Sequence, residues 1–110
     1  MDCIFCKIVA GQIPSDVVYT DDRVIAFRDI NPMAPVHLLI IPKKHVLSIN
    51  HLDVEDQPLA GEMVVVAKKM AEQYGVSETG YKLIFNVGRD GGQVIPHLHL
   101  HLMGGKKLAE

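Results

Sequence analysis

Long apolar runs, blocks of basic residues and repeated segments are all missing from this sequence of 110 residues. No stretch approaches the roughly 20 apolar residues that a membrane-spanning helix needs, so we expect no contact with a membrane. The opening MDCIFCKIVAG does not join a basic leader to a long apolar stretch, so we expect no signal peptide and a cytoplasmic protein. With a net charge of −2 and no basic block, electrostatic capture of a nucleic acid is not expected either.

Cysteine is also scarce, because Cys3 and Cys6 are the only two in the chain and form a C-x-x-C motif. A structural disulfide is unusual in a cytosolic domain of this size. A redox pair of the thioredoxin type follows a strand within a βαβ unit, and nothing precedes this motif that could form one. The remaining interpretation is half of a zinc site, which needs two more ligands from elsewhere.

What is present is the composition of an ordinary globular domain, with 48% apolar and 22% charged residues. We expect a single domain over residues 1–110 with one core. One long helix is predicted to start at Asp53 or Asp56, with Pro58 in its first turn, and to end at Gly75. Its buried face is expected to comprise Leu59, Met63, Val66, Met70 and Tyr74.

Short β-branched and aromatic segments predict strands at residues 17–19, 24–28, 37–41 and 81–87, and a last strand is expected from residue 96 through HLHLHLM. A short helix is predicted at residues 4–9, with a stop at Gly11. One long helix interrupts the strands, and helices and strands do not alternate regularly. This pattern favours an α+β domain with a mainly antiparallel sheet.

The HLHLHLM segment places three imidazoles at alternate positions of a strand. Because successive side chains point to opposite faces, we expect the leucines in the core and His97, His99 and His101 together on the other face. Alternate positions lie about 6.6–7 Å apart, which is too far for three imidazoles to share one zinc ion easily.

A solvated histidine-rich face and a metal-only site are two interpretations of this segment, and chemistry on phosphorus is the third. Neutral imidazole is a competent nucleophile near neutral pH because its ordinary pKa is about 6.5. The glycine-rich loop at residues 88–93 precedes the strand and supplies backbone N–H groups that can approach a phosphate closely. Loop and strand together favour the third interpretation.

The motif HLHLHLM resembles the HxHxHxx signature of the histidine triad (HIT) family. The segments IFCKIVAGQIP, DDRVIAFRDINPMAPVHLLIIPKKH and GYKLIFNVGRDGGQVIPHLHLHLMGG resemble the HINT branch, in the same order and over nearly the whole chain. The resemblance implies a HIT-like α+β fold, with an antiparallel sheet of about five strands, one long helix and a short N-terminal helix. It also implies a homodimer in which the long helices pack together, and the apolar pair Val64 and Val65 agrees with a second partner for that helix.

The implied activity is hydrolysis of purine nucleoside 5′-phosphoramidates or related AMP conjugates, with release of AMP or GMP. His99 would attack the α-phosphorus, and water would then release the monophosphate from a nucleotidyl-histidine intermediate. His101 would contact the phosphate and His37 would help with proton transfer. Two alternatives stay open: a purine nucleotide-binding regulatory or adaptor protein, and a dinucleoside polyphosphate hydrolase.

The resemblance assigns further residues to the substrate. Asp29 would bind the ribose hydroxyls and Asn86 would lie beside the ribose or phosphate, although the residues alone also fit a turn residue and a strand-end cap. Many relatives have serine at the position of Val94, where a hydroxyl can assist the leaving nitrogen, so here proton delivery would fall to His37 or water. The phosphate would meet backbone groups of Gln93, Val94 and Ile95. The base pocket would be lined by Phe5, Ile8, Phe27 and Ile30, which plain core explains better from the residues alone.

The resemblance also completes the half site at the cysteines. Cys3, Cys6, His45 and His97 would form a closed Cys₂His₂ site for structural Zn²⁺. His97 would then serve the metal, while His99 and His101 serve the phosphate. Without the C-x-x-C motif, His45 would be an exposed histidine, and the cysteines would be two small buried hydrophobes. No role is assigned to His51.

Overall fold

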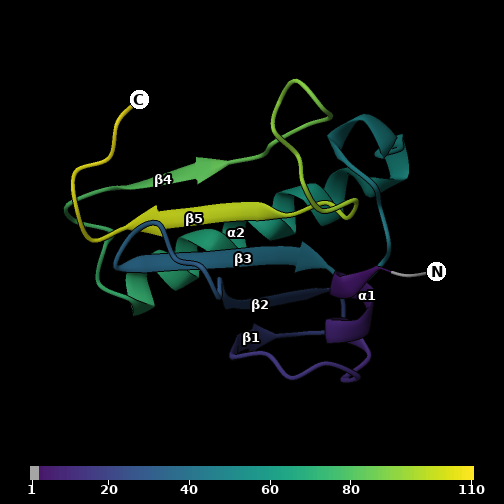
Figure 1. Cartoon of the computed structure of the whole chain (residues 1–110), viewed down its shortest axis with the longest axis horizontal. Coiled ribbons are helices and arrows are strands. Elements are labelled where there is room, and N and C mark those ends of the chain that lie inside the picture. The colour runs from purple at the N-terminus through teal and green to yellow at the C-terminus, as the bar shows by residue number, and fades with distance from the viewer. Residues whose placement is uncertain (1–2) are drawn as a thin grey trace.

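The computed structural model describes residues 3–110 and shows a five-stranded antiparallel sheet with a long helix behind it (Figure 1). The strand order is β1-β2-β3-β5-β4, and every neighbouring pair is antiparallel. The predicted α+β fold with about five strands is confirmed. The strands are β1 (Val17–Thr20), β2 (Val24–Arg28), β3 (Val36–Pro42), β4 (Tyr81–Ile84) and β5 (Leu100–Gly104).

Two α-helices flank this sheet, α1 (Ile4–Val9) and α2 (Gln57–Gln73). Cys3 caps α1, because its Sγ accepts a hydrogen bond from the Cys6 N–H at 3.3 Å. The side chains of Asp53 and Asp56 form a capping box on the 3₁₀ turn Val54–Asp56, directly before α2. No helix within residues 3–110 has both the length and the apolar character needed to cross a bilayer.

The sheet buries apolar side chains on both faces, in two separate clusters. On one face, Ala26 of β2 and Ile40 of β3 pack in the core against α2, together with the predicted helix residues Leu59, Met63, Val66 and Met70. On the other face, Phe27 and Leu39 pack with Phe5 of α1. Burial on both faces explains why residues 38–41 of β3 are all apolar.

The predicted last strand is too long at its start, because β5 pairs with its neighbours only from Leu100 onward. The backbone before it is held by loops instead: the Leu98 N–H donates to the Val46 carbonyl at 2.6 Å, and the His97 N–H donates to the Ile95 carbonyl at 2.8 Å. The alternation nevertheless continues through the unpaired part, since Leu98 lies in the core against α2. The strand predicted at residues 81–87 is likewise shorter, and β4 ends at Ile84.

Candidate functional site

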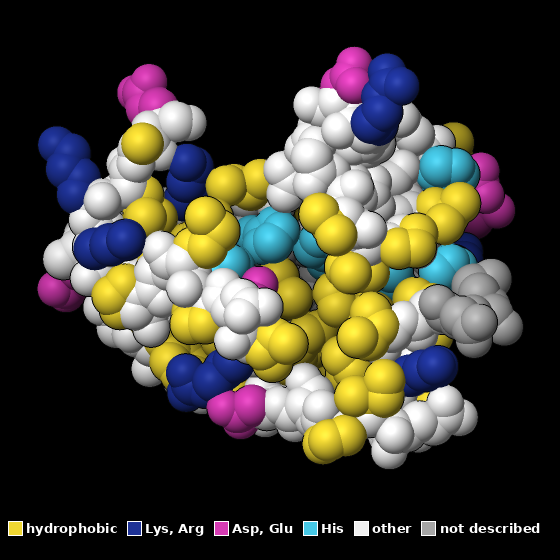
Figure 2. Space-filling view, viewed as in Figure 1, with side chains coloured by type: hydrophobic (Ala, Val, Ile, Leu, Met, Phe, Trp, Pro, Cys, Tyr) yellow, Lys and Arg dark blue, Asp and Glu magenta, His cyan; other side chains and the backbone are white. Residues whose placement is uncertain are grey.

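A cavity of about 490 Å³ opens on the face of the sheet that α2 does not cover. Its walls come from α1 and the turn after it, the ends of β2 and β3, and the loop that precedes β5. Figure 2 shows histidines in a hollow near the middle of this face, framed by hydrophobic side chains. The volume lies within the usual range for small-molecule sites.

Most of the residues predicted to act on substrate line this cavity. They are Phe5, Ile8, Phe27, Asp29, Ile30, His37, Asn86, Val94, Ile95, His99 and His101. Phe5 and Phe27 are buried core residues as well, so the core and pocket interpretations both describe them. Ile30 and Val94 form the open rim, with 89% and 84% of their surface exposed. Gln93 does not line the cavity, because its side chain bonds to neighbouring loops.

Sequence reasoning missed Ile13 and Pro14 as cavity residues. They lie in the turn that follows α1, and neither a periodicity nor a motif marks them. Only the packing of that turn beside β2 brings them to the site.

His99 is held with a defined nitrogen available for chemistry. The residue is 7% exposed, and its Nδ1–H donates to the backbone carbonyl of His97 at 2.7 Å. In a neutral imidazole the other nitrogen then carries the lone pair. Phe5 contacts the ring edge-on at 5.3 Å between centroids, which limits its rotation. His99 can therefore act as a nucleophile through Nε2.

A chain of hydrogen bonds also orients His37 and His101. The Met33 N–H donates to His37 Nδ1 at 3.1 Å, so the proton of neutral His37 is on Nε2. That nitrogen lies 3.0 Å from His101 Nδ1 and 3.4 Å from Asp29 Oδ2. His101 Nδ1 accepts from His37, which leaves the His101 proton on Nε2. His101 is thus set to donate a hydrogen bond.

Burial keeps this pair of histidines neutral. It lowers the pKa of His101 to about 4, helped by the neighbouring His99 and His37 and opposed by the Asp29 carboxylate. Burial likewise lowers the pKa of His37, again against the effect of Asp29. At neutral pH both rings therefore exchange hydrogen bonds and carry no charge.

Asp29 and Asn86 are each partly engaged within the protein. Asp29 Oδ1 accepts from the Asn31 N–H at 2.8 Å, and Oδ2 faces His37. The first bond is that of a turn residue, one of the two roles that the sequence allowed for Asp29. Asn86 Nδ2 donates to the Gly91 carbonyl at 2.8 Å, and this bond ties the glycine-rich loop to the end of β4. Among residues 3–110, no hydrogen bond engages the side-chain oxygen of Asn86, so it can meet a ligand.

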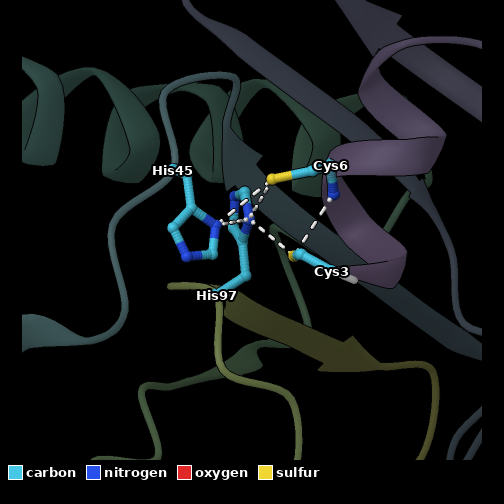
Figure 3. A group of neighbouring side chains, drawn as sticks. All are labelled: Cys3, Cys6, His45 and His97. Carbon is cyan, nitrogen blue, oxygen red and sulfur yellow. Dashed lines mark hydrogen bonds between the residues drawn. The ribbon is translucent and has the colours of Figure 1, made fainter. Parts of the chain in front are cut away.

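A second cluster lies beside the cavity and consists of Cys3, Cys6, His45 and His97 (Figure 3). Both cysteines come from the α1 region, His45 follows β3, and His97 precedes β5. The four ligand atoms all lie within 4.8 Å of one another. His97 Nε2 donates to the Pro42 carbonyl at 2.9 Å, so Nδ1 carries its lone pair toward the sulfur atoms.

The spacing of these atoms fits a tetrahedral metal ion. Around zinc, two nitrogen ligands lie about 3.3 Å apart, and nitrogen and sulfur lie about 3.6 Å apart. Here the two Nδ1 atoms of His45 and His97 are 3.1 Å apart, and the nitrogen–sulfur distances are 3.2, 3.4 and 3.6 Å. Burial and the neighbouring Cys3 raise the pKa of the Cys6 thiol, so a cation would be what favours its thiolate.

Asp29, His37 and His101 also lie within ligand distance of one another, but they fit a metal less well. A neutral histidine that binds metal through Nε2 carries its proton on Nδ1. His37 Nδ1 already accepts the Met33 N–H, so that proton would point at another donor. This group is therefore better suited to moving protons than to holding an ion.

Comparisons of the sequence and of the structure with known proteins agree with one another. The HIT domain model matches residues 10–108. The chain is 50% identical to the purine nucleoside phosphoramidase of Escherichia coli (strain K12) over 107 residues, which cover 97% of this chain and 90% of that protein. A HIT family hydrolase from Legionella pneumophila Philadelphia 1 superposes with a TM-score of 0.96 at 51% identity, over 98% of this chain and 96% of that one. A histidine triad protein from Clostridium difficile gives 0.96 at 49% identity, over 100% and 96%.

Proposed function

The chain belongs to the HIT domain family, and from this membership we propose that it hydrolyses purine nucleoside 5′-phosphoramidates or related AMP conjugates. Hydrolase activity is supported by the relatives, among them a purine nucleoside phosphoramidase and a HIT family hydrolase. One observation carries the proposal for this chain: His99, bonded through Nδ1 to the His97 carbonyl, lines a cavity of nucleotide size, and its ring centroid lies 5.0 Å from that of His101.

In the proposed reaction, His99 Nε2 bonds to the α-phosphorus and the bond from phosphorus to the leaving nitrogen breaks. The nitrogen leaves as an amine after it gains one proton. Water then attacks the same phosphorus, the bond to His99 breaks, and the nucleoside monophosphate is released. The ring returns to its starting tautomer because the His97 carbonyl still holds Nδ1–H.

The proton supply follows from the hydrogen bonds around His101. Its Nε2–H can donate to a phosphoryl oxygen or pass to the leaving nitrogen, and the water that attacks the phosphorus then returns one proton to this nitrogen. His37 keeps its own proton and holds His101 Nδ1 through the 3.0 Å contact. Val94 has no hydroxyl to share this task. Asp29 would bind the ribose, and the apolar side chains of α1 and β2 would hold the purine.

Replacement of His99 by alanine tests the proposal. We expect His99→Ala to abolish AMP release from adenosine 5′-monophosphoramidate and to leave AMP binding within a few fold of wild type, because the binding walls remain. His51→Ala, an exposed substitution away from the cavity, is the matched control and should retain turnover. AMP release by His99→Ala at the wild-type rate would refute the assigned nucleophile.

The two alternative functions give different results in the same assays. A wild-type protein that binds AMP tightly and releases none from the phosphoramidate would be a nucleotide-binding regulatory protein. Release of AMP from a diadenosine polyphosphate at a comparable rate would favour the dinucleoside polyphosphate hydrolase.

The proposal includes a structural Zn²⁺ ion held by Cys3, Cys6, His45 and His97, supported by their distances and donor types. When bound, zinc would cross-link α1 to the segments around β3 and β5, and it would have no open position for substrate. Metal analysis of the purified protein should give close to one zinc per chain, and His45→Ala should lose it. Two free thiols at this place also agree with a cytoplasmic location, which we propose as well.

The proposal also includes a homodimer formed through α2. Val64 and Val65 leave 44% and 51% of their surface exposed on this helix, although its opposite face is in the core. Burial of such an apolar pair favours association. Light scattering should give the mass of a dimer, and Val65→Lys should shift it toward the monomer. Val54→Lys, at a 77% exposed position outside α2, should not.

A further inference from the structure

Gln93 is tied to three separate backbone positions by its side chain. Its Oε1 accepts from the Gly88 N–H at 3.0 Å, and its Nε2 donates to the Leu47 carbonyl at 2.7 Å and to the Ile95 carbonyl at 3.0 Å. The Gln93 N–H also donates to the Gly88 carbonyl at 3.0 Å. One carboxamide thus closes the glycine-rich loop on itself and attaches it to a different segment of the chain.

The anchor at Leu47 is itself well held. Its neighbour Val46 is 6% exposed and accepts the Leu98 N–H at 2.6 Å, and His45 lies in the cysteine–histidine cluster. The carbonyl that Gln93 reaches therefore belongs to a segment already bonded to the chain just before β5. The hydrogen bond from Gln93 to Leu47 therefore fixes the glycine-rich loop relative to the segment that carries the histidines.

The loop that Gln93 holds forms one wall of the cavity. Gly92, Val94 and Ile95 line it, next to His99 and His101. Within residues 3–110, no hydrogen bond engages the backbone N–H of Val94 or of Ile95. Free N–H groups in a concave wall are what a phosphate or a developing anion binds.

We propose that Gln93 is a positioning residue of the phosphate site, whose carboxamide holds residues 88–95 so that the N–H groups of Val94 and Ile95 meet the phosphate. The inference rests on the proposed function, because it presumes a nucleotide in this cavity. The Gln93 side chain does not line the cavity, so it would act on the phosphate through the loop that it holds.

Two substitutions of similar length separate the parts of this role. Gln93→Glu keeps an acceptor for the Gly88 N–H but loses both donors and points a carboxylate at two carbonyls. Gln93→Met keeps the length and loses all three hydrogen bonds. The same changes at Gln73, an exposed residue at the end of α2, are the matched controls.

The readout is the ratio of AMP affinity to adenosine affinity, measured by calorimetry for each protein. Loss of two neutral hydrogen bonds should lower AMP affinity about tenfold. Adenosine binding should change by less than about twofold, because the nucleoside walls come from α1 and β2. A general loss of structure would weaken both ligands, and the Gln73 variants should change neither.

The outcomes distinguish this inference from the proposed function. If both Gln93 variants keep the wild-type ratio, or lose AMP and adenosine equally, the positioning role is wrong while the hydrolase proposal stands. If wild type itself binds AMP no better than adenosine, no phosphate site exists here and both fail. Faster amide hydrogen exchange at residues 88–92 in the Gln93 variants, with unchanged exchange in α2, would support the role directly.

Discussion

Acid should weaken the fold through His101, and the size of the effect follows from its surroundings. The ring is half-buried beside His37 and His99, and its pKa is about 4, against 6.5 in an unfolded chain. The folded-state pKa is the lower one, so the unfolded chain binds the proton first as the pH falls. The stabilisation is therefore complete above about pH 6.5 and is lost progressively as the pH falls toward about 4.

The difference between the two pKa values sets the magnitude. Between about pH 7.5 and about pH 4.5, proton uptake by the unfolded chain lowers the free energy of unfolding by about 2–3 kcal/mol for this one residue. The variant His101→Asn cannot take up that proton. Its free energy of unfolding should therefore fall by about 2–3 kcal/mol less than that of wild type over the same range.

Urea unfolding at several pH values between these limits is the assay. Acid also affects the cysteine–histidine cluster, but it does so in both proteins, and the difference between them reports on His101 together with its coupling to His37 and His99. Val94→Asn, a neutral change in the same cavity wall, should follow the wild-type pH dependence. Parallel wild-type and His101→Asn curves would show that His101 is not desolvated in the fold, and the argument for a neutral donor at neutral pH would fail with it.

Three further results are expected. Leu102 is 0% exposed in the core against α2, so Leu102→Ala should lower the free energy of unfolding by about 2–5 kcal/mol in urea titrations, whereas Leu83→Ala at a 38% exposed position should cost far less. Gly61 lies inside α2, and a Cβ added there would meet nothing within 4 Å. Gly61→Ala should therefore raise the free energy of unfolding by about 0.5–1 kcal/mol. A lower melting temperature for the variant would contradict this. Addition of zinc at about 1,000 times its dissociation constant should stabilise metal-free wild type by about 4 kcal/mol in thermal unfolding. The stability of Cys6→Ala should not change. Equal shifts in the two proteins would place the metal elsewhere.

The sequence was enough to predict the fold class, both α-helices and the separation of leucines from histidines at the last strand. These features depend on local periodicity and on turn residues such as Gly11 and Gly75, which both have φ of 74°. The conformation of a short segment is dictated largely by its own residues. The C-x-x-C motif likewise marked half of the cysteine–histidine cluster without any knowledge of its partners.

Strand ends and site contacts depended on residues far away in the chain. Nothing within HLHLHLM indicates that pairing starts only at Leu100, because the competing hydrogen bond comes from Val46. Nothing near Met33 indicates that its N–H sets the tautomer of His37. The proposed division of the histidines between metal and phosphate came from a family resemblance and not from their spacing.

By itself, then, the sequence determined which side chains share a face, because a strand or a helix repeats over a few residues. Only the tertiary structure decided which nitrogen of each histidine is free, how far Cys6 lies from His97, and that Gln93 reaches Leu47. Such contacts are set by how α1, β3 and the loop before β5 pack together, and no local pattern encodes a distance between segments.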